Sequence, residues 1–106
     1  MVSQFEVYWV DLNPTIGAEM QKTRPCVVVS PQELNEHLDT VIIVPITSAI
    51  HGYPYRVGCR IMGRDGEMAT DQIRTIDKQR LKKRIAMLSD SEVTALQDVL
   101  RQMFCE

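Results

Sequence analysis

The sequence predicts a mainly β protein, a small antiparallel barrel that is partly closed and is followed by a C-terminal helix. Short runs of β-branched and aromatic residues recur at residues 7–12, 25–30 and 41–44. Proline, glycine, asparagine and aspartate separate these runs, which favours turns between neighbouring strands. Near residue 90, a capping box opens an amphipathic helical pattern. We expect five to seven short strands, mostly antiparallel.

The size and composition are those of one folded domain. With 106 residues, of which 44% are hydrophobic and 25% charged, the chain should form a single domain over residues 1–106. No apolar run approaches the ~20 residues that span a bilayer, so no membrane contact is expected. The first six residues lack the basic and apolar regions of a signal peptide. We therefore expect a cytoplasmic protein.

The residue types that bind metals or act as nucleophiles form no recognisable cluster. Cys26, Cys59 and Cys105 are odd in number and widely spaced, which favours reduced structural thiols. His37 and His51 fall in predicted loops, where a histidine pair for acid–base cleavage of RNA is conceivable, although surface positions are the commoner case. We expect neither a metal nor another cofactor.

Turn signals divide the predicted strands. The third strand should end at Pro45, which has no amide proton to donate to a sheet. A hairpin is expected at residues 63–66, with Asp65-Gly66 at its centre. A long polar loop is expected at residues 13–23, and loops of this length are often functional. The expected strands cover residues 7–12, 25–30, 41–44, 56–61, 67–70 and 84–88, with single helical turns at 31–35 and 78–81.

The C-terminal helix has a clear start and one apolar face. Ser89 and Glu92 have the spacing of a capping box, in which each side chain binds the other residue's amide. The apolar stripe predicts packing against the core or against an interface rather than a ligand site. It consists of Val93, Leu96, Val99, Leu100, Met103 and Phe104.

The formal net charge of −2 does not indicate a nucleic-acid-binding protein. The positive charges are nevertheless unevenly distributed, with five cations within residues 78–84 and further arginines at positions 56, 60, 64 and 74. A local basic surface on a nearly neutral protein is therefore possible. A solvated turn or strand edge remains the alternative for residues 78–84.

Two polar residues stand at the ends of neighbouring strands. Arg24 precedes the second strand, and Pro25 holds the backbone extended there. Thr47 follows the third strand. If the strands pair in chain order, the two side chains meet at one end of the sheet, where a cation and a hydroxyl can bind a phosphodiester. These residues alone leave open that Arg24 is an ordinary surface arginine.

Several segments together resemble the MazF/PemK family of toxins, in order and over essentially the whole chain. The segment at residues 71–81 is similar to the family's most recognisable segment. The matching segments are WVDLNPT at 9–15, GAE at 17–19, Thr-Arg-Pro at 23–25, VPITS at 44–48 and DQIRTIDKQRL at 71–81.

This resemblance implies an SH3-like barrel of the CcdB/MazF type with a C-terminal helix, acting as a homodimer. It also implies the toxin of a type II toxin–antitoxin system, a sequence-specific and ribosome-independent endoribonuclease that cleaves single-stranded mRNA and so inhibits translation and growth. The implied protein partner is an antitoxin, whose flexible acidic C-terminal segment covers the active groove. Basic residues within 78–84 would favour its binding.

The resemblance also assigns site residues. By family motif, Arg24 and Thr47 are the catalytic pair, and Asp71 is an acidic catalytic position proposed in some members. Some relatives carry a histidine where this chain has Ala18 and an arginine where it has Ala69, so mechanisms that need those groups do not apply. Base recognition is expected from loops 13–23 and 50–56, whose tyrosines can stack on unpaired bases. The expected RNA contacts are Glu19, Ser48, Tyr53, Tyr55, Arg56, Gln72 and Arg74.

The implied mechanism is metal-independent. The ribose 2′-OH attacks the adjacent phosphorus and gives a 2′,3′-cyclic phosphate and a 5′-OH end. Arg24 would stabilise the charge on the phosphorane-like state, and Thr47 would donate a hydrogen bond to a phosphate oxygen. Because the pKa of a free arginine is above ~12, Arg24 suits this role better than that of general base. The sequence leaves the general base unassigned.

Two other functions remain open at this point. A DNA-gyrase poison can share the same barrel, but it needs no arginine–threonine pair at the strand ends. A catalytically silent relative that only binds RNA or an antitoxin is the second alternative, and the departures at Ala18 and Ala69 keep it open.

Overall fold

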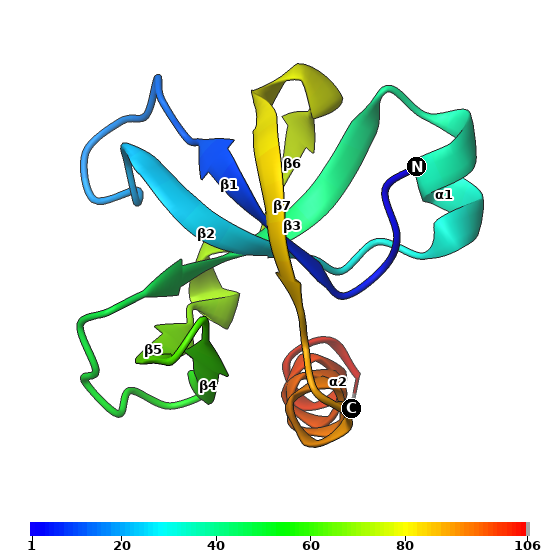
Figure 1. The fold of residues 1–106 in the computed structure, drawn as a ribbon. Coiled ribbons are helices and arrows are strands. Elements are labelled where there is room, and N and C mark those ends of the chain that lie inside the picture. The colour runs from blue at the N-terminus through cyan, green and yellow to red at the C-terminus, as the bar shows by residue number, and fades with distance from the viewer. Residues whose placement is uncertain (106) are drawn as a thin grey trace.

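In the computed structural model, which describes residues 1–105, seven strands form one strongly curved antiparallel sheet with two helices outside it (Figure 1). The strand order is β4-β5-β3-β2-β1-β7, and β6 pairs with β3 beside this path. This confirms the mainly β, SH3-like fold with a C-terminal helix. The strands are β1 (Glu6–Asp11), β2 (Thr23–Val28), β3 (Thr40–Thr47), β4 (Val57–Ile61), β5 (Arg64–Met68), β6 (Arg74–Asp77) and β7 (Leu81–Met87). The helices are α1 (Gln32–His37) and α2 (Asp90–Phe104), with 3-10 turns η1 (Thr70–Gln72) and η2 (Lys78–Arg80).

Two apolar clusters lie on the two faces of the central strands. Val27 and Val44 belong to the cluster that α2 covers, whereas Cys26, Val28 and Ile43 belong to the other. Successive side chains of a strand point to opposite faces, so β2 and β3 are buried on both sides. This explains their near-continuous apolar sequences.

β3 does not end at Pro45, which corrects the sequence-based expectation. The strand continues to Thr47, and Pro45 is paired with Cys26 in the register of β2. The proline carbonyl accepts a hydrogen bond from Ala69 N at 2.8 Å. β3 pairs with β6 through residues 40–43, and beyond Pro45 it pairs with β5 instead, through Ile46 and Thr47. A missing amide donor is tolerated at such an interruption of the ladder.

The predicted hairpin exists, but its turn is misplaced in the prediction. The turn residues are Met62 and Gly63, with φ angles of 53° and 78°, whereas Asp65 and Gly66 lie within β5. Both turn residues have positive φ, as a type I′ hairpin requires. Gly66 is needed for another reason, because a Cβ atom there would lie 2.9 Å from the carbonyl oxygen of Thr47.

The remaining elements follow the sequence closely. Residues 12–22 form the expected long loop, α1 and η2 are the two short helical turns, and β7 begins three residues earlier than predicted. The capping box is present, since Ser89 and Glu92 each accept a hydrogen bond from the other's amide. All three cysteines are free. No helix among residues 1–105 is long and apolar enough to cross a bilayer.

Helix α2 lies below the sheet, beside the edge strand β4 (Figure 1). Glu92 accepts a hydrogen bond from Arg60 N of β4 at 2.7 Å, so the helix also covers part of an exposed strand edge. Among the helix residues, Leu96 is the one fully buried, whereas Phe104 at the end of the predicted apolar stripe is 65% exposed. Leu96 therefore makes the main apolar contact that holds α2.

Replacing Leu96 with alanine should lower the free energy of unfolding by about 2–5 kcal/mol, because the change leaves a cavity between α2 and the sheet. Urea denaturation would measure it. Leu38→Ala is a suitable control, since Leu38 is 46% exposed and should cost much less. Equal losses in the two variants would contradict the role assigned to Leu96.

Candidate active-site groove

An open groove of about 510 Å³ lies where β2 begins and β3 ends. Arg24 and Thr47 both line it, as their positions at neighbouring strand ends predicted, and Ser48 lies beside them. The opposite wall comes from the β4–β5 hairpin. Further lining residues are Trp9, Ile46, Ile61, Met62, Arg64 and Asp65. The groove therefore joins a polar, cationic end to an apolar wall.

The register of β2 against β3 brings Arg24 near Thr47. The pairing ends with Cys26 opposite Pro45, and Arg24 and Thr47 each lie two residues beyond this pair, at the same end of the two strands, where both line the groove. Arg24 Nε donates a hydrogen bond to the carbonyl of Gln21 at 3.0 Å. Within residues 1–105, the guanidinium forms no ion pair with a carboxylate. Its terminal N–H groups can therefore meet an anion.

Thr47 is 6% exposed and is held tightly in the sheet. Its Oγ1 accepts a hydrogen bond from Ala49 N at 3.1 Å, which leaves the hydroxyl proton to be donated elsewhere. Across the sheet, Thr47 is paired with Glu67 of β5. The close approach of Gly66 to the Thr47 carbonyl fixes the distance between these strands.

The groove end that holds Arg24 is electropositive. Burial raises the pKa of the neighbouring Cys26 thiol to about 12, although the positive charges of Arg74 and Arg24 oppose this increase. Asp65 is the carboxylate among the groove-lining residues, and it pairs with Arg60 at 3.1 Å. Arg64 forms no ion pair within residues 1–105. The groove can thus attract a phosphate group.

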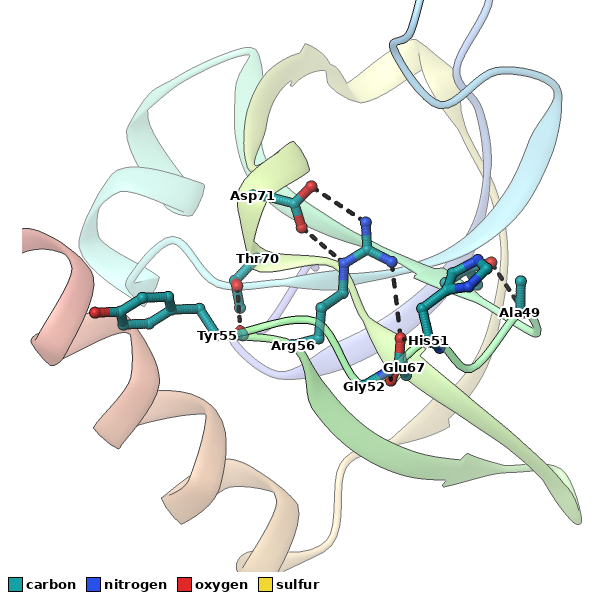
Figure 2. A network of polar contacts seen from close by, with 9 residues as sticks. Ala49, His51, Gly52, Tyr55, Arg56, Glu67, Thr70 and Asp71 are labelled. Carbon is teal, nitrogen blue, oxygen red and sulfur yellow. Dashed lines mark hydrogen bonds and ion pairs between the residues drawn. The ribbon is translucent and has the colours of Figure 1, made fainter.

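Asp71 does not line the groove with Arg24 and Thr47. Its carboxylate instead accepts two hydrogen bonds from Arg56, at 2.8 Å from Nε and 3.2 Å from Nη2 (Figure 2). Arg56 Nη1 also lies 3.7 Å from Glu67 Oε1. The hydrogen bond to Arg56 lowers the pKa of Asp71, and the same bond raises the pKa of Arg56. The structure therefore joins two predicted site residues to each other.

Three other predicted RNA contacts support the loop at residues 12–22. Gln72 Oε1 accepts a hydrogen bond from Met20 N at 3.2 Å, and Arg74 Nη1 donates one to the Leu12 carbonyl at 3.2 Å. Glu19 Oε1 accepts one from Ile16 N at 2.7 Å, within the loop itself. These contacts shape the loop that precedes Arg24, and none of the three side chains lines the groove.

The two tyrosines of the loop between β3 and β4 lie differently. Tyr53 is 54% exposed, stacks on His51 with ring centroids 4.9 Å apart, and has the Arg56 guanidinium 5.1 Å from its ring centroid. The Tyr55 ring extends to the other side, towards α2 (Figure 2). Tyr53 is thus part of an aromatic pair, whereas Tyr55 lies apart from it.

Sequence reasoning missed the apolar wall and Arg64. Trp9 is an outward-facing residue of β1, paired with Pro25, and is 38% exposed. Met62 is 71% exposed because it occupies the hairpin turn. The hairpin signal at residues 63–66 was visible in the sequence, but its packing beside the end of β3 was not. Knowledge of the β3–β5 pairing was needed to bring Arg64 to the groove.

Fold and groove together define a small β-barrel protein with an arginine-containing groove at a strand end. The family model described as "PemK-like, MazF-like toxin of type II toxin-antitoxin system" matches residues 3–104. The chain therefore belongs to this toxin family. A relative from Staphylococcus epidermidis named Endoribonuclease MazF is 31% identical, and the match covers 94% of this chain and 88% of the relative.

Solved structures show the same fold. MazF from Deinococcus radiodurans has a TM-score of 0.87 at 23% identity, over 99% of this chain and 97% of that chain. A mycobacterial endoribonuclease in complex with its cognate antitoxin has a TM-score of 0.81 at 20% identity, over 96% of this chain and 93% of that chain. The chain thus has this fold over nearly its whole length.

Replacing Gly66 with alanine should displace Thr47, because the new Cβ would lie 2.9 Å from its carbonyl oxygen and 3.2 Å from Ile46 Cγ2. We expect a loss of about 1–3 kcal/mol in unfolding free energy, with shifted amide NMR signals at Thr47 and Ala49.

Gly58→Ala in the adjacent strand β4 is the matched control, since a Cβ there has no atom within 4 Å. It should be neutral or slightly stabilising. If both variants shifted the Thr47 signals equally, the close approach at Gly66 would not be what positions Thr47.

Proposed function

We propose that this protein is an endoribonuclease toxin that cleaves single-stranded RNA in the groove between Arg24 and Thr47. The observation that carries the proposal is a guanidinium without a carboxylate partner within residues 1–105, on the same groove as a buried hydroxyl. The family assignment and the relative named Endoribonuclease MazF support it.

The cleavage step is a transesterification within the RNA strand, in which solvent water takes the proton from the 2′-OH and supplies one to the leaving oxygen. The ribose 2′-oxygen forms a bond to phosphorus, and the bond from phosphorus to the 5′-oxygen of the next nucleotide breaks. The proton lost from the 2′-OH is balanced by one gained at the 5′-oxygen. Arg24 stabilises the negative charge that develops on the phosphate oxygens, and Thr47 donates a hydrogen bond to one of them.

Asp71 is a poor general base in this arrangement. Its carboxylate is held by Arg56 outside the groove lining, and its lowered pKa reduces its affinity for a proton. We therefore assign charge stabilisation to Arg24 and Thr47 and do not route the proton from the 2′-OH through Asp71.

The apolar wall favours RNA with unpaired bases. Trp9 and Met62 expose apolar surface along the groove, and an aromatic ring next to a phosphate-binding cation is a common way to hold a single strand. Arg64 adds a second cation for a neighbouring phosphate. Duplex RNA would not offer its bases to this wall. Single-stranded mRNA in the cytoplasm is therefore the proposed substrate.

A cognate antitoxin is the proposed protein partner, in line with the related toxin structures that contain one. The exposed side chains of Lys82 and Lys83 on the edge strand β7 offer positive charge to an acidic segment. A homodimer is also proposed, because Met87 and Phe104 leave apolar surface uncovered, with exposed fractions of 50% and 65%.

Two alternatives are less well supported: a gyrase poison, and a catalytically silent relative that only binds RNA or an antitoxin. A gyrase poison makes no use of the Arg24–Thr47 groove, and the Staphylococcus epidermidis relative and the mycobacterial structure are both named as endoribonucleases. Purified protein incubated with RNA in the absence of gyrase separates the endoribonuclease from both alternatives, because only the endoribonuclease cleaves the RNA.

Arg24→Ala should reduce RNA cleavage by about 100-fold or more while leaving the fold intact, because the main charge-stabilising group is lost. Arg24→Lys should recover part of the activity, since it keeps the charge but not the planar fork. Cleavage rates on a pool of single-stranded RNA, with sequencing of the cut ends, give both the activity and the recognition motif.

Arg101→Ala is the control, because this exposed arginine lies on α2 and pairs with Asp98. It should cleave like the wild-type protein. Unchanged cleavage by a folded Arg24→Ala variant would refute the catalytic assignment.

A further inference from the structure

Arg56 joins two carboxylates that come from different elements. Its side chain is 9% exposed, and it binds Asp71 of η1 through two nitrogen atoms and approaches Glu67 of β5 with the third (Figure 2). An arginine with such paired partners is fixed in one orientation. We call Arg56, Glu67 and Asp71 the arginine clamp.

Glu67 carries the clamp into the loop between β3 and β4. Its two carboxylate oxygens accept hydrogen bonds from His51 N at 3.2 Å and Gly52 N at 2.8 Å. These bonds lower the pKa of Glu67, with that from Gly52 the stronger, so the carboxylate stays charged at neutral pH. The loop is thus bound at its middle by the strand that pairs with Thr47.

Both ends of the same loop are also held. At its start, Ala49 N donates to Thr47 Oγ1 at 3.1 Å. At its end, Thr70 Oγ1 donates a hydrogen bond to the carbonyl oxygen of Tyr55. The backbone of Tyr55 has a positive φ angle of 66°. A non-glycine residue in this left-handed region is held there by its surroundings. Residues 48–56 therefore have one defined path, although most of their side chains are exposed.

The clamp holds an aromatic pair on the loop that leaves the groove at Ser48. The rings of His51 and Tyr53 are stacked with an interplanar angle of 16°, and Arg56 lies against the Tyr53 ring. Ser48, three residues before His51, lines the groove next to Thr47. An exposed stack at this place suits a base that flanks the scissile phosphate.

We infer that Arg56, Glu67 and Asp71 are positioning residues that hold loop 48–56, so that the His51–Tyr53 stack binds an unpaired RNA base next to Thr47. The inference rests on the proposed endoribonuclease function and adds to it a site for the flanking base. It also gives Asp71 a different role from proton transfer, because Asp71 acts through Arg56. Loss of the clamp should weaken RNA binding much more than it slows the chemical step.

A double-mutant cycle tests this assignment. Arg56→Gln, Asp71→Asn and the double variant would be compared on the single-stranded RNA oligonucleotide that the wild-type protein cuts best. We expect each single variant to raise KM about 10-fold and to keep kcat within about 3-fold of wild type. If Asp71 acts through Arg56, the double variant should be no worse than Arg56→Gln alone.

Amide hydrogen exchange of the free variants gives an independent readout of the loop. Residues 48–56 should exchange at least 10-fold faster in both single variants, while the central strands keep their protection. Asp98→Asn is the matched control, because it removes an exposed arginine–aspartate pair on α2 and should change neither KM nor the loop exchange. If Arg56→Gln fails to fold, Arg56→Lys and Asp71→Asn carry the test.

The possible results separate the inference from the proposed function. A kcat that falls 100-fold in Asp71→Asn, and falls further in the double variant, would show that Asp71 acts directly and would overturn the positioning role. Unchanged exchange in residues 48–56 would overturn the clamp itself. If the wild-type protein cleaves no RNA, the proposed function fails together with the base site, whereas the exchange experiment still decides whether the clamp holds the loop.

Discussion

The pairing of β3 with three different strands is the constraint on which the rest of the structure depends. Its first part pairs with β2 and β6, and its last two residues pair with β5. This arrangement brings the start of β2, the end of β3 and the β4–β5 hairpin to one groove. A slip of one residue would turn Thr47 to the other face of the sheet and separate it from Arg24. The burial of β2 and β3 on both faces prevents such a slip, because it would misplace every core side chain.

The partners of each arginine side chain decide whether the arginine supports the fold or faces the groove. Arg56 is enclosed by carboxylates and binds a loop, and Arg74 supports the loop that precedes β2 through the Leu12 carbonyl. Arg24 and Arg64 reach the groove without a carboxylate partner within residues 1–105. The protein therefore has a cationic groove despite its net charge of −2.

Strand composition and turn chemistry predicted much of the fold, and the strand-end positions of Arg24 and Thr47 predicted that they would meet. The sequence could not show that Pro45 lies within β3, because only the switch of partners there makes its missing donor harmless. It also favoured Asp65-Gly66 as the turn, although that glycine is required by its contact with Thr47. These errors share one cause, since each depends on contacts between residues distant in the chain.

The same cause explains what was unforeseen in the candidate site. Its place in loop 50–56 made Arg56 an expected RNA contact, and the family motif made Asp71 a catalytic group, whereas the structure pairs the two with each other. Trp9 was placed correctly on a strand, but its position on the groove follows from the curvature of the sheet. Local patterns predict elements well, and the partners of a charged side chain are decided by the tertiary fold.

The central claim is that RNA is cleaved by its own 2′-OH at the Arg24–Thr47 groove. Mass spectrometry of the fragments that the purified protein produces in the presence of EDTA tests this most directly. The claim predicts a 2′,3′-cyclic phosphate on each upstream fragment and a 5′-OH on each downstream fragment. A 3′-OH paired with a 5′-phosphate would show attack by water instead of the ribose hydroxyl and would contradict the claim.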